Sequence, residues 1–83
     1  MSGNHDQEAR ALVALALGKA IDEVPPDGDI DSVSGWDSLG HTRLMLSLEA
    51  RLGRTLMPEE IVRLRSVRAI VHVLGGDRGM RDR

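Results

Sequence analysis

Ser38 is the residue of this chain best placed for chemistry, because its hydroxyl stands between a long loop and a helix-forming segment. It follows Asp37 and precedes Leu39. The positive end of a helix favours anions, so a phosphodiester on Ser38 would be stabilised by the helix dipole and by free N–H groups. Ser38 could instead cap the helix, and Asp37 could do so equally well. The two residues alone leave both interpretations open.

Other arrangements of reactive residues are weaker. The run from Gly35 to Gly40 is not a G-x-S-x-G nucleophile elbow, and no strand precedes it. The three histidines, His5, His41 and His72, lack metal-ligand spacing. The chain has no cysteine, so any thiol chemistry would have to come from a cofactor. We therefore expect neither an enzyme active site nor a metal site.

The composition predicts one small domain over residues 1–83 and disfavours several classes of protein. So short a chain buries one modest core and is poorly suited to a deep catalytic cleft. Trp36 is the only aromatic residue and no basic stripe accompanies it, so we expect no nucleic-acid partner. Neither a signal peptide nor a membrane span is visible. We expect a cytoplasmic monomer that does not bind membranes.

The net charge of −2 is unevenly distributed along the chain. Residues 1–42 carry eight Asp and Glu against two Lys and Arg, whereas residues 43–83 carry five against nine. This asymmetry indicates either solvated faces of both signs or an acidic half that meets basic partner surfaces.

Apolar periodicity and helix signals predict four helices, at about residues 5–18, 38–52, 58–63 and 66–75. Asn4 or Asp6 is a candidate cap for the first helix, and Ser66 for the fourth. Pro58 suits a first helical turn. Residues 77–83 are expected to form a frayed, charged tail.

The connection between the first two helices is long and rich in helix breakers. The run from Pro25 to Gly28 predicts a turn, in which Asp-Gly tolerates left-handed geometry. Long loops in small domains tend to be functional. Four apolar residues are expected to pin this loop onto the core: Ile21, Val24, Ile30 and Val33.

The predicted helix 38–52 has two apolar faces. At about 100° per residue, one face should point to the core. His41 falls on the same side of the helix as this face, where we expect a packed, hydrogen-bonded residue. The second apolar face contains Arg43 and is flanked by Thr42 and Glu49. Scattered exposed apolar residues are normal, whereas an apolar face rimmed by charge marks an interaction site, so both interpretations stay open. The core face consists of Leu44, Met45, Leu48 and Leu52, and the second face of Leu39, Leu46 and Ala50.

The tripeptide Asp37-Ser38-Leu39, after a long loop and before a helix, resembles the phosphopantetheine attachment motif of the acyl carrier and peptidyl carrier protein family. The similarity spans about residues 8–75 and continues through Leu44–Glu49, Leu56–Glu60 and Ser66-Val67. It implies an all-α four-helix bundle of the acyl-carrier type, with a long loop between helices 1 and 2 and a short third helix. It also implies that Ser38, flanked by Asp37, receives 4′-phosphopantetheine from coenzyme A through a magnesium-dependent phosphopantetheinyl transferase.

The resemblance further implies a non-catalytic carrier that holds acyl or aminoacyl groups as thioesters on this arm. Such a carrier presents its cargo to partner enzymes: an acyl transferase or adenylating ligase that loads it, and a downstream synthase or transferase. The family's recognition face on helix 2 corresponds here to Trp36, Leu39, Thr42, Arg43, Leu46, Glu49 and Ala50.

The chain departs from the carriers of bacterial fatty acid synthesis on this face. Gly40, Arg43 and Ala50 stand where those carriers are often acidic. The run from Gly35 to His41 looks more like discrete carriers of specialised polyketide or nonribosomal pathways. The alternatives are primary fatty acid synthesis, an unmodified helical interaction module and a small DNA-binding protein. Cargo could also fold back into the bundle, although a solid core is the default, and the candidate lining residues are Leu44, Met45, Leu48, Leu52, Ile61 and Leu64.

Overall fold

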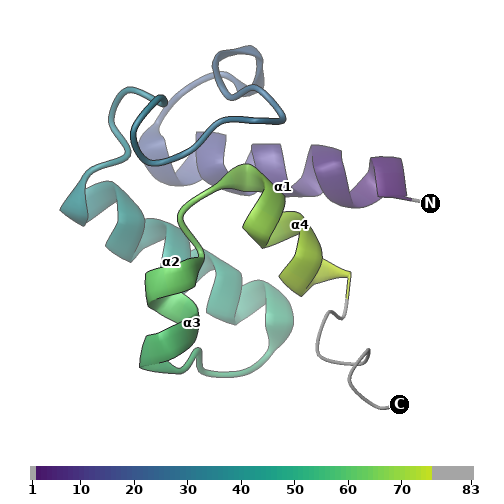
Figure 1. The fold of residues 1–83 in the computed structure, drawn as a ribbon, viewed down its shortest axis with the longest axis vertical. Helices are drawn as coiled ribbons and strands as arrows, with labels where there is room; N and C mark the ends of the chain where they lie inside the picture. The colour runs from purple at the N-terminus through teal and green to yellow at the C-terminus, as the bar shows by residue number, and fades with distance from the viewer. Residues whose placement is uncertain (1, 76–83) are drawn as a thin grey trace.

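The computed structural model of the chain describes residues 2–75 and is all-helical, as predicted. Its elements are α1 (Ser2–Leu17), the 3₁₀ helix η1 (Ile21–Glu23), α2 (Ser38–Leu52), α3 (Pro58–Arg63) and α4 (Val67–Leu74) (Figure 1). The described residues contain no strand, only one isolated bridge between Asp29 and Ser66. The tail predicted at residues 77–83 lies outside them.

The first helix begins earlier than the sequence predicts. It starts at Ser2, so Asn4 and Asp6 lie inside the helix and not at the position before its first residue, where a cap was expected. It ends at Leu17, and Gly18 follows with a φ of 70°, a left-handed conformation that glycine adopts without steric cost.

One hydrophobic core joins α1, α2 and α4, with α1 packed against both of the other two. Burial of each large aliphatic side chain here contributes about 1.5–3 kcal/mol. The predicted core face of α2 is confirmed, since Leu44, Met45 and Leu48 are buried and Leu52 packs against them. The largest fully buried side chains are Leu44, Leu48, Ile70, Val13, Val24 and Val67.

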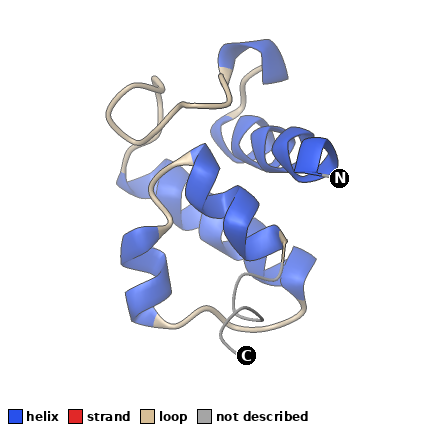
Figure 2. Ribbon diagram, turned by 45° about the vertical axis from the view of Figure 1, so that its right-hand side comes forward, coloured by secondary structure: helices blue, strands red, loops and turns tan. Residues whose placement is uncertain are grey.

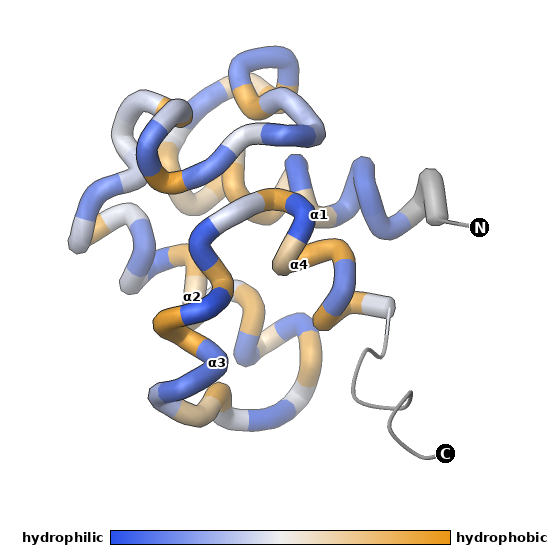
Figure 3. The backbone as a smooth tube through the Cα atoms, viewed as in Figure 1, coloured by the Kyte–Doolittle hydropathy of each residue, from blue (hydrophilic) through white to orange (hydrophobic). Residues whose placement is uncertain are grey.

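The long loop between α1 and α2 is held down by apolar residues, as predicted. Val24 and Val33 are buried, and Ile21 and Ile30 pack against the core. Figure 2 shows the connection as loop apart from the turn of η1, which the sequence analysis missed. In Figure 3 the loop is mostly blue and white, with short orange stretches.

Gly28 is required for space and not for left-handed geometry, which corrects the expectation for this turn. Its φ is not positive, and an added Cβ would lie 2.8 Å from a methyl carbon of Val33. Its carbonyl accepts a hydrogen bond from Val67 N–H at 3.0 Å. Ile30 N–H donates to the Arg65 carbonyl at 2.9 Å. The loop is therefore bonded to the start of α4.

The ends of the later helices follow the predicted signals closely. Gly53 ends α2 with a φ of 72°. Pro58 begins α3, and the Ser66 hydroxyl caps α4 by accepting the Ala69 N–H at 3.1 Å. Because Ser66 is the cap and Gly75 the residue after the last turn, α4 itself is one residue shorter at each end than predicted.

A chain of hydrogen bonds through His41 ties the loop, α2 and α3 together. The indole N–H of Trp36 donates to His41 Nδ1 at 3.0 Å, and His41 Nε2 lies 3.1 Å from the carbonyl oxygen of Ile61. Since a carbonyl can only accept, this pattern has Nε2 as the donor and Nδ1 as the acceptor. The expectation of a packed, satisfied histidine is confirmed.

We predict that His41→Ala lowers the free energy of unfolding by about 1–3 kcal/mol, because it leaves the buried Trp36 N–H without an acceptor. The emission of Trp36, the only aromatic residue, should shift to longer wavelength as water reaches the indole. Urea denaturation and fluorescence spectra measure the two effects. His72→Ala, at an exposed site on α4, is the matched control. Equal urea midpoints for the two variants would contradict the assignment.

Glu60 stabilises the α2–α3 connection and the start of α3. Its carboxylate accepts the Met57 N–H at 2.9 Å and makes two hydrogen bonds to Arg54, at 3.0 and 2.9 Å. The Arg54 guanidinium, helped by the Met57 N–H, lowers the pKa of Glu60 from 4.5 to about 2. The ionised form is therefore the one that favours the folded state.

We predict that Glu60 stabilises the protein fully above about pH 4.5, and that this contribution is lost as the pH falls toward 2. Because the ion pair is partly exposed, its worth at pH 7 should be at most about 1 kcal/mol. Glu60→Gln should be less stable than the parent at pH 7, and the two should converge near pH 2. Urea midpoints across this range test the prediction, with Glu59→Gln as control. A pH-independent difference would refute it.

Candidate functional site

Ser38 is exposed and is the first residue of α2, whose start lies below the long loop in Figure 1. Of the two residues that could cap this helix, Ser38 and Asp37, it is Asp37 that is the N-cap. Its carboxylate accepts the Gly40 N–H at 2.9 Å. Within residues 2–75 the Ser38 hydroxyl makes no hydrogen bond, whereas its carbonyl accepts the Thr42 hydroxyl at 2.9 Å. The hydroxyl is therefore available for modification.

Gly40 allows the start of α2 to lie close to the preceding loop and to α1. A Cβ at this position would lie 2.5 Å from the Gly35 carbonyl oxygen and 2.5 Å from the Leu17 side chain. Gly40 is thus buried, so it contributes nothing to the exposed face of α2. Sequence analysis missed this role, although a glycine inside a helix, which weakens the helix, signals a close approach.

The surroundings of Ser38 fit the phosphodiester of a phosphopantetheine arm. The first N–H groups of a helix have no intrahelical acceptor, and the helix dipole favours a negative charge there. Within the described residues, neither a histidine nor a carboxylate is hydrogen-bonded to the Ser38 hydroxyl. Within residues 2–75 the serine therefore lacks a hydrogen-bonded base that could activate it.

The second apolar face of α2 is exposed to solvent. Leu39 is 60% exposed and Leu46 is 62% exposed, and Arg43 and Ala50 are exposed beside them. Thr42 is also exposed, although its hydroxyl is bonded to the Ser38 carbonyl. The structure thus brings five of the predicted contact residues onto one surface beside Ser38.

Two other predicted contact residues are not free on this surface. Trp36 is only 3% exposed, because its indole packs in the core and bonds to His41. Assigning it to a partner surface was therefore wrong. Glu49 is half-buried, and its carboxylate accepts the Leu56 N–H at 2.8 Å, which fixes the α2–α3 loop.

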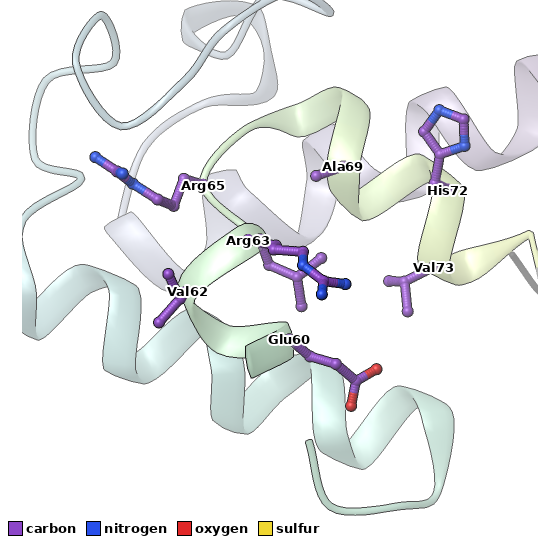
Figure 4. Close-up of a pocket in the computed structure, with 8 residues that line it drawn as sticks. Glu60, Val62, Arg63, Arg65, Ala69, His72 and Val73 are labelled. Carbon is purple, nitrogen blue, oxygen red and sulfur yellow. The ribbon is translucent and has the colours of Figure 1, made fainter. Parts of the chain in front are cut away.

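A groove of about 600 Å³ lies between α3 and α4, and neither Ser38 nor the predicted contact residues of α2 line it. Figure 4 shows Glu60 and Arg63 projecting toward Val73, whereas Val62 and Arg65, which also line the groove, project in the opposite direction. Of the proposed cargo-lining residues, Leu64 alone lines this groove, whereas Leu44, Met45 and Leu48 belong to the packed core. The groove's lining residues are Glu60, Val62, Arg63, Leu64, Arg65, Ala69, His72 and Val73.

Two other features, a cluster of metal ligands and a membrane-spanning helix, are absent from the described part of the chain. No group of three or more His, Cys, Asp or Glu side chains there could hold a metal ion. None of the helices described is long and apolar enough to cross a membrane.

Comparison with known proteins identifies the family. No curated protein matches the chain. Residues 7–74 match the family described as "Phosphopantetheine attachment site". This match begins within α1 and runs to the end of α4, and it includes the capped start of α2 with Ser38. The chain therefore belongs to the family of acyl and peptidyl carrier domains that attach 4′-phosphopantetheine.

Proposed function

We propose that this protein is a carrier whose Ser38 holds 4′-phosphopantetheine and presents acyl or aminoacyl groups to partner enzymes. The observation that carries the proposal is the division of roles at the start of α2. Asp37 supplies the cap through its bond to Gly40 N–H, so the adjacent serine hydroxyl is exposed and unbonded. Membership of the phosphopantetheine family makes this hydroxyl the best candidate for the attachment point.

The residues around Ser38 position the arm and perform no chemistry of their own. The arm supplies the thiol on which cargo is held as a thioester, and the chain has no cysteine that could compete with it. Asp37 fixes the direction of α2, and the end of the helix stabilises the phosphate charge. A tether that keeps cargo near successive active sites raises its effective concentration. We therefore propose that the protein is not itself an enzyme.

We propose that the pathway is a specialised one, of the polyketide or nonribosomal type. Support comes from the exposed face of α2, where Arg43 and Ala50 stand beside Leu39 and Leu46. This face differs in charge from that of fatty-acid carriers, because its central charged residue is an arginine. Primary fatty acid synthesis is the alternative within the carrier class.

The proposed partners follow from the stages of a carrier's cycle. A phosphopantetheinyl transferase modifies Ser38, an acyl transferase or adenylating ligase loads the arm, and a synthase or transferase removes the cargo. We propose that a monomer meets these enzymes in the cytoplasm through Leu39, Thr42, Arg43, Leu46 and Ala50, all of which are exposed.

We predict that coenzyme A and a broad-specificity phosphopantetheinyl transferase add the mass of one phosphopantetheine to the protein, and that Ser38→Ala abolishes the addition. Intact-protein mass spectrometry measures both. Ser34→Ala, at an exposed serine of the preceding loop, is the matched control and should be modified like the parent. An unmodified parent would favour the helical interaction module, in which Ser38 carries nothing. Full modification of Ser38→Ala would place the arm elsewhere.

We predict that the modified protein is loaded by an adenylating ligase or an acyl transferase of a specialised pathway and is not elongated by fatty-acid enzymes. The reason is the mismatch between the α2 face and enzymes that dock on an acidic carrier. Mass spectrometry after incubation with each enzyme set measures loading, and a bacterial fatty-acid carrier serves as the positive control for elongation. Efficient turnover through the complete fatty-acid cycle would refute the specialised assignment.

A further inference from the structure

The exposed face of α2 forms a narrow stripe, which we call the α2 stripe: Leu39, Arg43, Leu46 and Ala50. These residues are spaced by four, three and four positions. At about 100° per residue they fall within an arc of about 60° on the helix surface. Leu44 and Leu48, on the opposite side, are fully buried. The α2 stripe therefore points directly away from the core.

The two leucines make the α2 stripe a surface that another molecule would cover. Leu39 and Leu46 are among the few large apolar side chains of the described chain that are more than half exposed. Leu39 is also the residue next to Ser38, so a molecule that reaches Ser38 meets the α2 stripe. Covering both leucines removes apolar area from water, which favours association.

Arg43 lies between these leucines and determines which partner can cover them. Leu39 is one helical turn before it, and Leu46 nearly one turn after it. A surface that covers both leucines must also remove water from at least part of the guanidinium. An unpaired charge at a dry interface is costly, so the partner must offer it an acceptor.

The chain's own carboxylates near the α2 stripe are already used elsewhere. Asp37 accepts the Gly40 N–H at 2.9 Å, and Glu49 accepts the Leu56 N–H at 2.8 Å. On the α1 side, Glu8 is paired with Arg51 through two hydrogen bonds. No hydrogen bond or ion pair of Arg43 occurs within residues 2–75. The acceptor for Arg43 must therefore come from outside residues 2–75.

We infer that the α2 stripe docks on a protein surface that pairs an apolar groove with a carboxylate placed opposite Arg43. A bidentate carboxylate matches the planar guanidinium best, which makes the contact both attractive and selective. A partner that presents lysine or arginine at this point is rejected by like-charge repulsion. The inference rests on the proposed partner surface of α2 and not on the modification of Ser38.

Two synthetic amphipathic helical peptides test this inference on the full chain. They share one leucine face and differ only in its flanks, which are glutamate in one and lysine in the other. In an NMR titration of the ¹⁵N-labelled protein at low salt, the glutamate-flanked peptide should shift the amides of residues 38–50. Its affinity should exceed that of the lysine-flanked peptide by about tenfold, since opposite charges attract and like charges repel at the docking point.

Charge reversal provides the decisive comparison. Arg43→Glu should invert the preference between the two peptides. Arg68→Glu, the same charge change at an exposed site on α4, should leave it intact. The spectra also report whether each variant is folded. Equal affinities, an unchanged preference in Arg43→Glu, shifts confined to the α3–α4 groove, or no binding of either peptide would each overturn the inference. Ser38 modification, measured separately by mass, is unaffected by any of these outcomes.

Discussion

The hydrogen bond from Gly40 N–H to the Asp37 carboxylate is the contact on which the functional end of this molecule depends. A helix that begins at the surface must satisfy its first N–H groups, and a serine is a common means of doing so. Here the preceding aspartate takes that role, so the serine is left with an exposed, unbonded hydroxyl. Capping and modification therefore do not compete for one side chain, and the start of α2 stays ordered while Ser38 remains accessible.

The position of this helix start is determined by contacts on both of its sides. Gly40 allows the Gly35 carbonyl and the Leu17 side chain to approach within the space a Cβ would occupy. His41, the next residue, accepts from Trp36 and donates to the Ile61 carbonyl. The loop and α1 thus meet α2 on one side and α3 meets it on the other. The exposed serine is in this way attached to a helix start that packs on both sides, which suits the arm that we propose for it.

Much of this could be predicted from the sequence, because helix periodicity and end signals are local. Pro58, Ser66 and Gly53 mark helix ends through their own geometry, and the two faces of α2 follow from its period. The errors came from tertiary contacts. Trp36 resembled a surface aromatic in sequence, yet its N–H has a buried partner five residues later. Glu49 resembled a free carboxylate, but it bonds a loop N–H that the helix period does not reveal.

The specificity that we propose for this protein lies on its surface. The Ser38 hydroxyl has no hydrogen-bonded base within the described residues, and the hydrophobic core contains no buried polar or charged side chain there. We propose that chemistry is left to the enzymes that bind the carrier, and that the carrier's own contribution is to determine which enzymes bind. The exposed part of α2 combines two leucines with one arginine, so the docking that we propose for it depends on apolar fit and on charge together. On this proposal, a substitution at Arg43 changes which enzymes bind while leaving the fold and Ser38 in place.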